Sequence, residues 1–137
     1  MILSKTSEYA IRVMTYIAVQ NKKLISAKSL SEDLSIPYKY LGQLLRRLSG
    51  AGFLEAAKGK HGGYRLNKDA GQIYLYQIID RLEGMETYQG CFLGFPKCDA
   101  ENPCALHTLW EKPREALLEM LFKTSIEDLV TNGMKRF

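Results

Sequence analysis

Apolar side chains recur at helical spacing through the first 50 residues. Residues 4–19, 27–34 and 38–49 each repeat apolar positions every three or four residues, which places them on one helix face. Ser26 precedes the second run as an N-cap, and glycines follow the third. Ser35-Ile36-Pro37 connects the second run to the third. The pattern predicts three helices, the last two joined by a tight turn.

Two short extended runs follow the third helix. Residues 53–57 form an extended run, and Tyr64-Arg65-Leu66 returns after the glycine-rich basic stretch Lys58-Gly59-Lys60-His61-Gly62-Gly63. Extended runs around such a tip predict a β-hairpin. Two short helices and a basic hairpin together are typical of a winged helix-turn-helix.

The second half of the chain has a different organisation. Helical spacing returns at residues 73–82, 105–122 and 126–130, and Pro113 predicts a kink or break in the long helix. Residues 85–103 have little periodicity. The predicted fold is mainly α with a small β-hairpin. A winged helix-turn-helix DNA-binding domain covers residues 1–83, and a cluster-binding loop and dimerisation helix cover residues 84–137.

The long helix carries more apolar surface than one small domain needs, which favours a homodimer interface. Burial against its own winged helix is the alternative. The apolar side chains concerned are Leu106, Leu109, Trp110, Leu117, Leu118, Leu121 and Phe122.

Charge is distributed unevenly along the chain. The first 70 residues carry 12 Lys/Arg against 5 Asp/Glu, whereas the remainder carries 7 against 10, within a net charge of +4. A basic first half favours contact with a polyanion there. Together with the helix-turn-helix pattern, this asymmetry predicts binding to a double-stranded DNA operator.

The predicted DNA-binding residues lie on the third helix and at the hairpin tip. The start of that helix offers base contacts, its later arginines offer phosphate contacts, and the tip follows the backbone or enters a minor groove. The residues are Tyr38, Lys39, Tyr40, Gln43, Arg46, Arg47, Lys58, Lys60 and His61.

Neither a signal peptide nor an apolar run of roughly 18 residues is present, so a cytoplasmic location without membrane contact is expected. Cytoplasmic thiols stay reduced, and cysteines there serve better as ligands or redox centres than as disulfides. No nucleophile–base set exists outside the cysteine region, so no enzyme activity is expected.

Three cysteines and a histidine form the pattern Cys91-x6-Cys98-x5-Cys104-x2-His107. Cys104 and His107 share a helix face, and a loop carrying two more thiolates can fold over it. Thiolates select zinc or iron–sulfur clusters, and the wide Cys–Cys gaps favour a cluster over zinc. A zinc-stabilised or thiol-switch winged-helix regulator remains the alternative, followed by an interaction module that does not bind DNA.

The chain resembles the bacterial Rrf-two family of winged-helix regulators along nearly its whole length. The resemblance includes the cysteine pattern and Trp110. The other motifs that carry it are Ser4-Lys5-x-x-Glu8-Tyr9-Ala10, Ile36-Pro37-x-x-Tyr40-Leu41-x-Gln43-Leu44-Leu45-x-x-Leu48, Lys58-Gly59-x-x-Gly62-Gly63-Tyr64-x-Leu66 and Ser125-Ile126-x-Asp128-Leu129.

This resemblance implies a homodimeric transcription regulator, in several members a repressor, whose DNA affinity depends on an iron–sulfur cluster. Cys91, Cys98 and Cys104 match the family's ligand cysteines, and His107 matches the fourth ligand of its two-iron members. Glu8 matches the acidic ligand that the partner subunit supplies in four-iron members. The implied cofactor is therefore 2Fe-2S first and 4Fe-4S second.

Overall fold

Helices α1 (Lys5–Val19), α2 (Ala27–Leu34) and α3 (Tyr38–Gly50) pack around one apolar core in the computed structural model, which describes residues 2–133 and 136–137. Met1 of the first expected domain and residues 134–135 of the second lie outside the described residues. Serines cap the first two helices, since Ser4 and Ser26 accept hydrogen bonds from the N–H groups of Ser7 and Ser29. The fully buried side chains of this core include Met14, Ile17, Leu30, Ile36, Leu41, Leu45 and Leu48.

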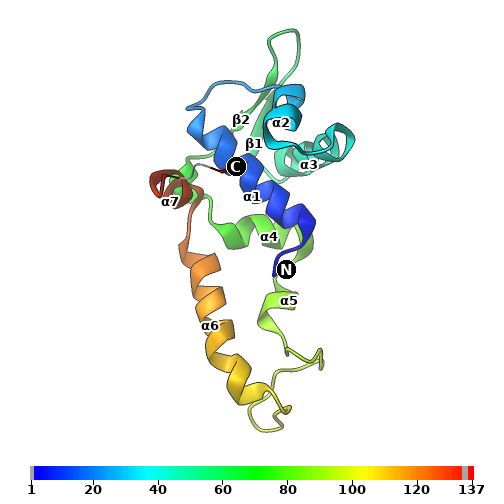
Figure 1. The fold of residues 1–137 in the computed structure, drawn as a ribbon, viewed down its shortest axis with the longest axis vertical. Helices are drawn as coiled ribbons and strands as arrows, with labels where there is room; N and C mark the ends of the chain where they lie inside the picture. The colour runs from blue at the N-terminus through cyan, green and yellow to red at the C-terminus, as the bar shows by residue number, and fades with distance from the viewer. Residues whose placement is uncertain (1, 134–135) are drawn as a thin grey trace.

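The predicted hairpin is present and projects from the body beyond α2 and α3 (Figure 1). Strands β1 (Leu54–Ala57) and β2 (Gly63–Leu66) pair antiparallel, with Leu54 opposite Leu66 and Ala57 opposite Gly63. Tyr64 exchanges backbone hydrogen bonds with Ile25, which fastens the hairpin to the segment before α2. Helix-turn-helix and hairpin together confirm the winged-helix fold.

The last helix returns to the first. The 3₁₀ turn η1 (Ala70–Gln72) and helix α4 (Leu75–Glu83) follow the hairpin, and α7 (Ile126–Thr131) packs on α1 and η1. α4 begins two residues later than predicted, because Ile73 and Leu75 hydrogen bond to Ile126 and Thr124. The winged-helix body, defined here as residues 2–83 with α7, therefore includes a segment from the second predicted domain.

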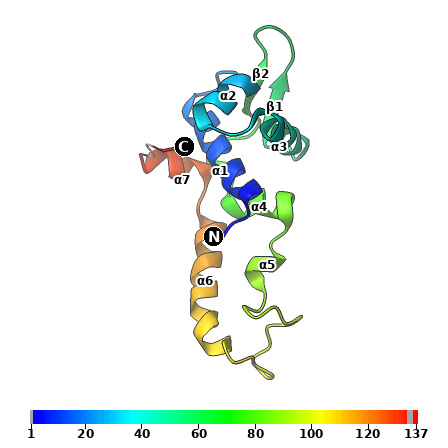
Figure 2. The same cartoon turned by 45° about the vertical axis from the view of Figure 1, so that its right-hand side comes forward.

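Residues 85–123 form an arm, called here the cysteine arm. It consists of helix α5 (Glu86–Gln89), the cysteine loop (residues 90–106) and helix α6 (His107–Lys123). Helices α5 and α6 run side by side away from the body (Figures 1 and 2). Pro113 lies inside α6 and the helix continues through it. The carbonyl group that loses a hydrogen-bond partner there belongs to Leu109, an exposed residue. Neither α6 nor any other helix of residues 2–133 has the length and apolar character for crossing a membrane.

Candidate DNA-binding surface and cysteine site

Helix α3 presents a polar face to solvent. Tyr38 is 61% exposed, and Lys39, Gln43 and Arg46 are exposed beside it. The opposite face is held in the core by Leu41, Leu44, Leu45 and Leu48. A helix with one anchored face and one free polar face can enter a major groove.

Two of the predicted DNA contacts already have partners within the chain. The Tyr40 hydroxyl lies 2.5 Å from Thr6 Oγ1, and its ring packs edge-on against Tyr9. The Arg47 guanidinium donates a 2.5 Å hydrogen bond to the carbonyl of Leu82 at the end of α4. These side chains hold the two ends of α3 in place, although Arg47 is exposed like Arg46.

The hairpin tip places Lys58, Lys60 and His61 in solvent. A side chain at Gly62 would bring its Cβ within 2.1 Å of the Ala57 carbonyl oxygen, so the tight tip requires glycine there. Its compact, basic end can therefore approach a sugar–phosphate backbone closely.

The structure gathers the predicted ligands into two pairs at the start of α6. Cys91 Sγ lies 3.6 Å from Cys104 Sγ, and Cys98 Sγ lies 3.5 Å from His107 Nδ1. His107 is only 9% exposed, and its backbone N–H donates to the Cys104 carbonyl. The three cysteines are free thiols, each partly buried.

Backbone N–H groups surround the Cys91 sulfur. Residues 91–94 form a turn in which the Gly94 N–H donates to the Cys91 carbonyl, with Gly94 at φ +80°. Desolvation alone would raise the pKa of Cys91, but hydrogen bonds lower it, first from the backbone of Phe95 and Leu93, then from the Cys104 side chain and the backbone of Gly94. The turn stabilises a thiolate, which is the form that binds metal.

The donor set suits a soft metal centre, although the four atoms do not yet converge. Within residues 2–133 and 136–137 no three His, Cys, Asp or Glu side chains are close enough to hold one ion. The two pairs nevertheless lie on one loop and one helix start, and each contains a thiol. Three sulfurs and one imidazole would reach a common centre, as a cluster or zinc requires, only if the loop moved.

Trp110 fixes the cysteine loop to α6. Its indole N–H donates a 3.0 Å hydrogen bond to the carbonyl of Gly90, and its ring packs edge-on against Phe92. Both contacts flank Cys91. The first turn of α6 therefore carries the predicted ligand His107 and the anchor Trp110.

Glu8 lies on α1, half-buried, and pairs with Lys5 at 3.4 Å. Within the described part of a single chain, Glu8 makes no hydrogen bond or ion pair with a cysteine. Its predicted role as a ligand from a partner subunit stays a prediction.

Sequence reasoning missed an ionisable cluster at the end of α4. The Glu83 carboxylate accepts hydrogen bonds from Ser4, from Ser7 and from the Tyr88 hydroxyl. Desolvation would raise the pKa of Glu83, but the bonds from Ser4, Tyr88 and Ser7 outweigh it and lower the pKa. Burial and the bond to Glu83 raise the pKa of Tyr88 to about 12. Two of these partners are 76 and 79 residues from Glu83, so no local pattern could reveal them.

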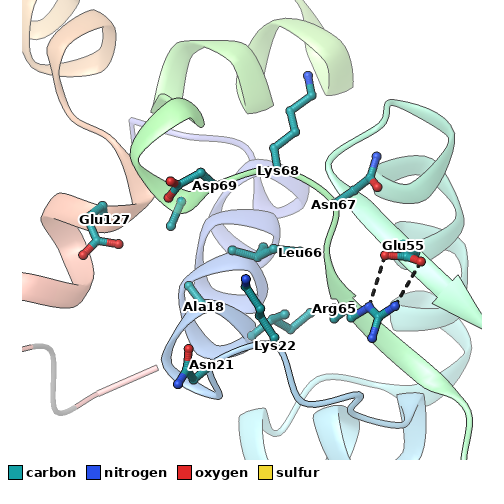
Figure 3. A pocket seen from close by; sticks show the side chains of 12 residues that line it. Ala18, Asn21, Lys22, Glu55, Arg65, Leu66, Asn67, Lys68, Asp69 and Glu127 are labelled. Atoms are coloured by element: carbon teal, nitrogen blue, oxygen red, sulfur yellow. Dashed lines mark hydrogen bonds and ion pairs between the residues drawn. The ribbon is translucent and has the colours of Figure 1, made fainter.

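A cavity of about 540 Å³ lies on the body, away from both sites (Figure 3). The end of α1, the hairpin base and α7 line it, and its Arg65 is paired with Glu55 by hydrogen bonds of 3.1 Å. It contains no cysteine and no residue of α3, so the predicted chemistry lies elsewhere.

Comparisons with known proteins agree with this architecture. Residues 3–132 match the family Rrf2, described as an iron-dependent transcriptional regulator. The chain is 30% identical over 132 residues to the transcriptional regulator NsrR of Shouchella clausii, covering 95% of this chain and 89% of that protein.

Solved structures give the same result. The global cysteine regulator CymR of B. subtilis superposes with a TM-score of 0.77 at 27% identity, covering 95% of this chain and 96% of CymR. IscR of T. potens has a TM-score of 0.74 at 25% identity, with 97% and 88% covered. These relatives regulate transcription and are not enzymes. The chain therefore belongs to the Rrf2 (Rrf-two) family of winged-helix, DNA-binding transcription regulators.

Proposed function

We propose that this regulator acts in the cytoplasm as a homodimer and senses iron–sulfur, redox or nitric oxide status through an iron–sulfur cluster. Cys91, Cys98, Cys104 and His107 would hold the cluster, with 2Fe-2S favoured over 4Fe-4S. The observation that carries the proposal is the pairing of Cys91 with Cys104 at 3.6 Å and of Cys98 with His107 at 3.5 Å. When bound, the cluster supplies an iron centre whose state depends on iron supply, oxidants and nitric oxide.

The residues around the ligands support iron binding in specific ways. Backbone N–H groups favour the Cys91 thiolate, and hydrogen bonds to cluster sulfurs tune reduction potential. Trp110 holds the loop against α6, and the burial of His107 fixes its ring. The family's description as iron-dependent supports iron over zinc.

Exposed apolar side chains on α6 support dimerisation. Leu109, Met120 and Phe122 are 71%, 51% and 40% exposed, and His107 and Leu121 are the helix's buried residues. The body of the same chain therefore buries only part of the apolar surface of α6. A second copy of α6 is the partner that a symmetric homodimer provides.

Dimerisation gives the sensor a route to DNA. Two copies of α3 in one dimer would enter major grooves one helical turn apart, about 34–36 Å. Residues 84–137 would sense the signal and pair with the second subunit, and residues 1–83 would bind DNA. This division of labour, with the contacts of Lys39, Gln43, Arg46 and the hairpin tip, stays a prediction.

Anaerobic purification tests the cluster directly. The proposal predicts a coloured protein with visible absorption, bound iron and acid-labile sulfide, or one that gains them on reconstitution. A colourless protein that takes up no iron under reconstitution would contradict it. Zinc bound tightly in the same analysis would favour the zinc-stabilised alternative.

The 3.6 Å approach of Cys91 and Cys104 also favours a second candidate, a thiol switch. Both thiols would lose a proton and together give two electrons to an oxidant such as a peroxide, forming one S–S bond. Mass spectrometry of the iron-free protein under oxidant would show loss of two hydrogens and a peptide joining the two residues. Full retention of free thiols would exclude this switch.

A further inference from the structure

The carboxylate of Glu83 joins three segments that are distant in sequence. One oxygen accepts from Ser7 Oγ at 2.8 Å and from Ser4 Oγ, and the other accepts from the Tyr88 hydroxyl at 2.5 Å. Ser7 is fully buried and Tyr88 is 4% exposed. The start of α1, the end of α4 and helix α5 therefore meet at one side chain, which we call the Glu83 junction (Ser4, Ser7, Glu83 and Tyr88).

Both ends of α3, the helix proposed to enter the major groove and called here the recognition helix, are fastened next to this junction. Thr6, which lies between the two junction serines, contacts the Tyr40 hydroxyl in the first turn of α3 at 2.5 Å. Leu82, which precedes Glu83, accepts the 2.5 Å hydrogen bond from Arg47 in the last turn of α3. A displacement of the junction therefore reaches α3 at two points and changes its orientation, not only its position.

The cysteine loop lies on the other side of the junction. Tyr88 is separated from Cys91 by two residues, and the carbonyl of the intervening Gly90 is held by Trp110 on α6. So short a segment, anchored at both ends, cannot absorb a movement of Cys91 by itself. A shift that brings Cys91 toward a shared centre must pull on the Tyr88 ring or on its hydroxyl.

We propose that the Glu83–Tyr88 hydrogen bond transmits the state of the cysteine loop to the recognition helix, with Glu83 and Tyr88 as positioning residues. The inference rests on the proposed function, because it names the internal link by which ligation at Cys91 alters DNA binding. Glu83 also fixes the N-cap of α1: the Ser4 hydroxyl donates to Glu83 while it accepts from the Ser7 N–H at 3.2 Å. Loss of the Tyr88 partner leaves the carboxylate held by the two serines alone and loosens the first turn of α1 along with it.

Tyr88→Phe tests the link because it deletes only the hydroxyl and keeps the buried ring. Glu83→Gln is the second variant, since it leaves one oxygen acceptor in place of two. Tyr16→Phe is the matched control: it deletes another tyrosine–carboxylate hydrogen bond, from Tyr16 to Asp33 at 2.6 Å, between α1 and α2. Thermal unfolding of all three full-length variants shows whether each is folded.

Two readouts separate this inference from the cluster proposal. The first is amide hydrogen exchange of the metal-free, DNA-free chain, which needs no cluster. The second is the ratio between the DNA dissociation constants of the cluster-loaded and cluster-free protein, which a general loss of stability would not change. Iron content is measured on every sample.

We expect Tyr88→Phe to exchange faster in α3 and in the first turn of α1, with α2 and the hairpin unchanged. The ratio of its DNA dissociation constants falls toward one, while its iron content equals that of the wild type. Glu83→Gln shows the same changes to a smaller degree. Tyr16→Phe changes neither the exchange in α3 nor the ratio. Wild-type exchange in α3 together with a wild-type ratio would overturn the junction and leave the cluster proposal standing. If the wild type binds no iron, the cluster proposal fails, and exchange in α3 alone decides for or against the junction.

Discussion

The winged-helix body and the cysteine arm obtain their order from different sources. The large side chains that are completely buried come almost entirely from the body, and Leu121 is the representative of the arm among them. The arm instead exposes Phe92, Leu93 and Phe95, which are 62%, 51% and 57% exposed. The body is stabilised by its own core, whereas the arm has apolar surface that a single chain leaves exposed. The proposed sensing role suits the arm, because a region with few buried contacts can change without unfolding the rest.

The sharpest test of this contrast is loss of a ligand. We expect Cys104→Ala to abolish iron binding while far-ultraviolet circular dichroism stays that of the wild type, because Cys104 is outside the core of the body. Iron analysis and absorption after anaerobic reconstitution measure the loss. Lys97→Ala, an exposed substitution in the same loop, serves as the control and should keep its iron. A cluster retained by Cys104→Ala would remove that residue from the ligand set.

Core substitutions should separate the two regions by stability. Leu45→Ala in the completely buried interior of the body should lower the free energy of unfolding by about 2–5 kcal/mol. Leu109→Ala, at a site 71% exposed on α6, should leave the free energy of unfolding of a monomer nearly unchanged and weaken dimer association. Urea unfolding and sedimentation velocity measure these effects. Equal losses of stability in both variants would contradict the division into a self-sufficient body and a dependent arm.

Arg46→Ala examines the function of the body. Because Arg46 is exposed on α3 and is expected to contact phosphate, its loss should weaken binding about equally for different DNA sequences. The slope of log affinity against log salt should decrease by about 0.9. Fluorescence anisotropy at several salt concentrations measures both quantities. Lys112→Ala, the same kind of change on α6, should have no such effect, and an unchanged slope for Arg46→Ala would place its side chain outside the interface.

The smallest expected effect is a dependence of stability on pH at the Glu83 junction. The pKa of Glu83 is lowered in the folded chain from a usual value of 4.5. The junction therefore contributes fully to the free energy of unfolding above pH 4.5 and loses that contribution as the pH falls through the folded pKa. Urea unfolding should show Glu83→Gln less stable than the wild type at pH 7, with the difference shrinking on acidification below pH 4.5. The exposed Glu86→Gln is the control. A difference that grows on acidification would mean that the folded state favours the protonated carboxyl.

The body could be predicted from sequence because its signals are local. Helix α2 has the predicted bounds, Ser26 caps it as expected, and the glycine-rich tip forms the hairpin. Each of these depends on residues a few positions apart. The late start of α4 was missed because its first residues hydrogen bond to a segment about fifty residues further along the chain.

The arm was predicted less completely. The spacing of the cysteines indicated one site, and the structure brings them together as two pairs. Helix α5 was predicted as irregular, since four residues are too short for a periodic signal. The break that Pro113 could have caused does not occur, and α6 runs from His107 to Lys123. The Glu83 junction depends on pairs that are distant in sequence, and no spacing rule could predict it.

Control of DNA binding in the body by the arm can be measured on one protein sample. One anaerobic preparation with a defined iron content is used to determine the dissociation constant for a selected operator before and after removal of the cluster. We expect the two constants to differ about 5-fold or more, which is the range of ordinary coupling between two sites. Equal constants in a preparation shown to carry and then lose its cluster would contradict this expectation.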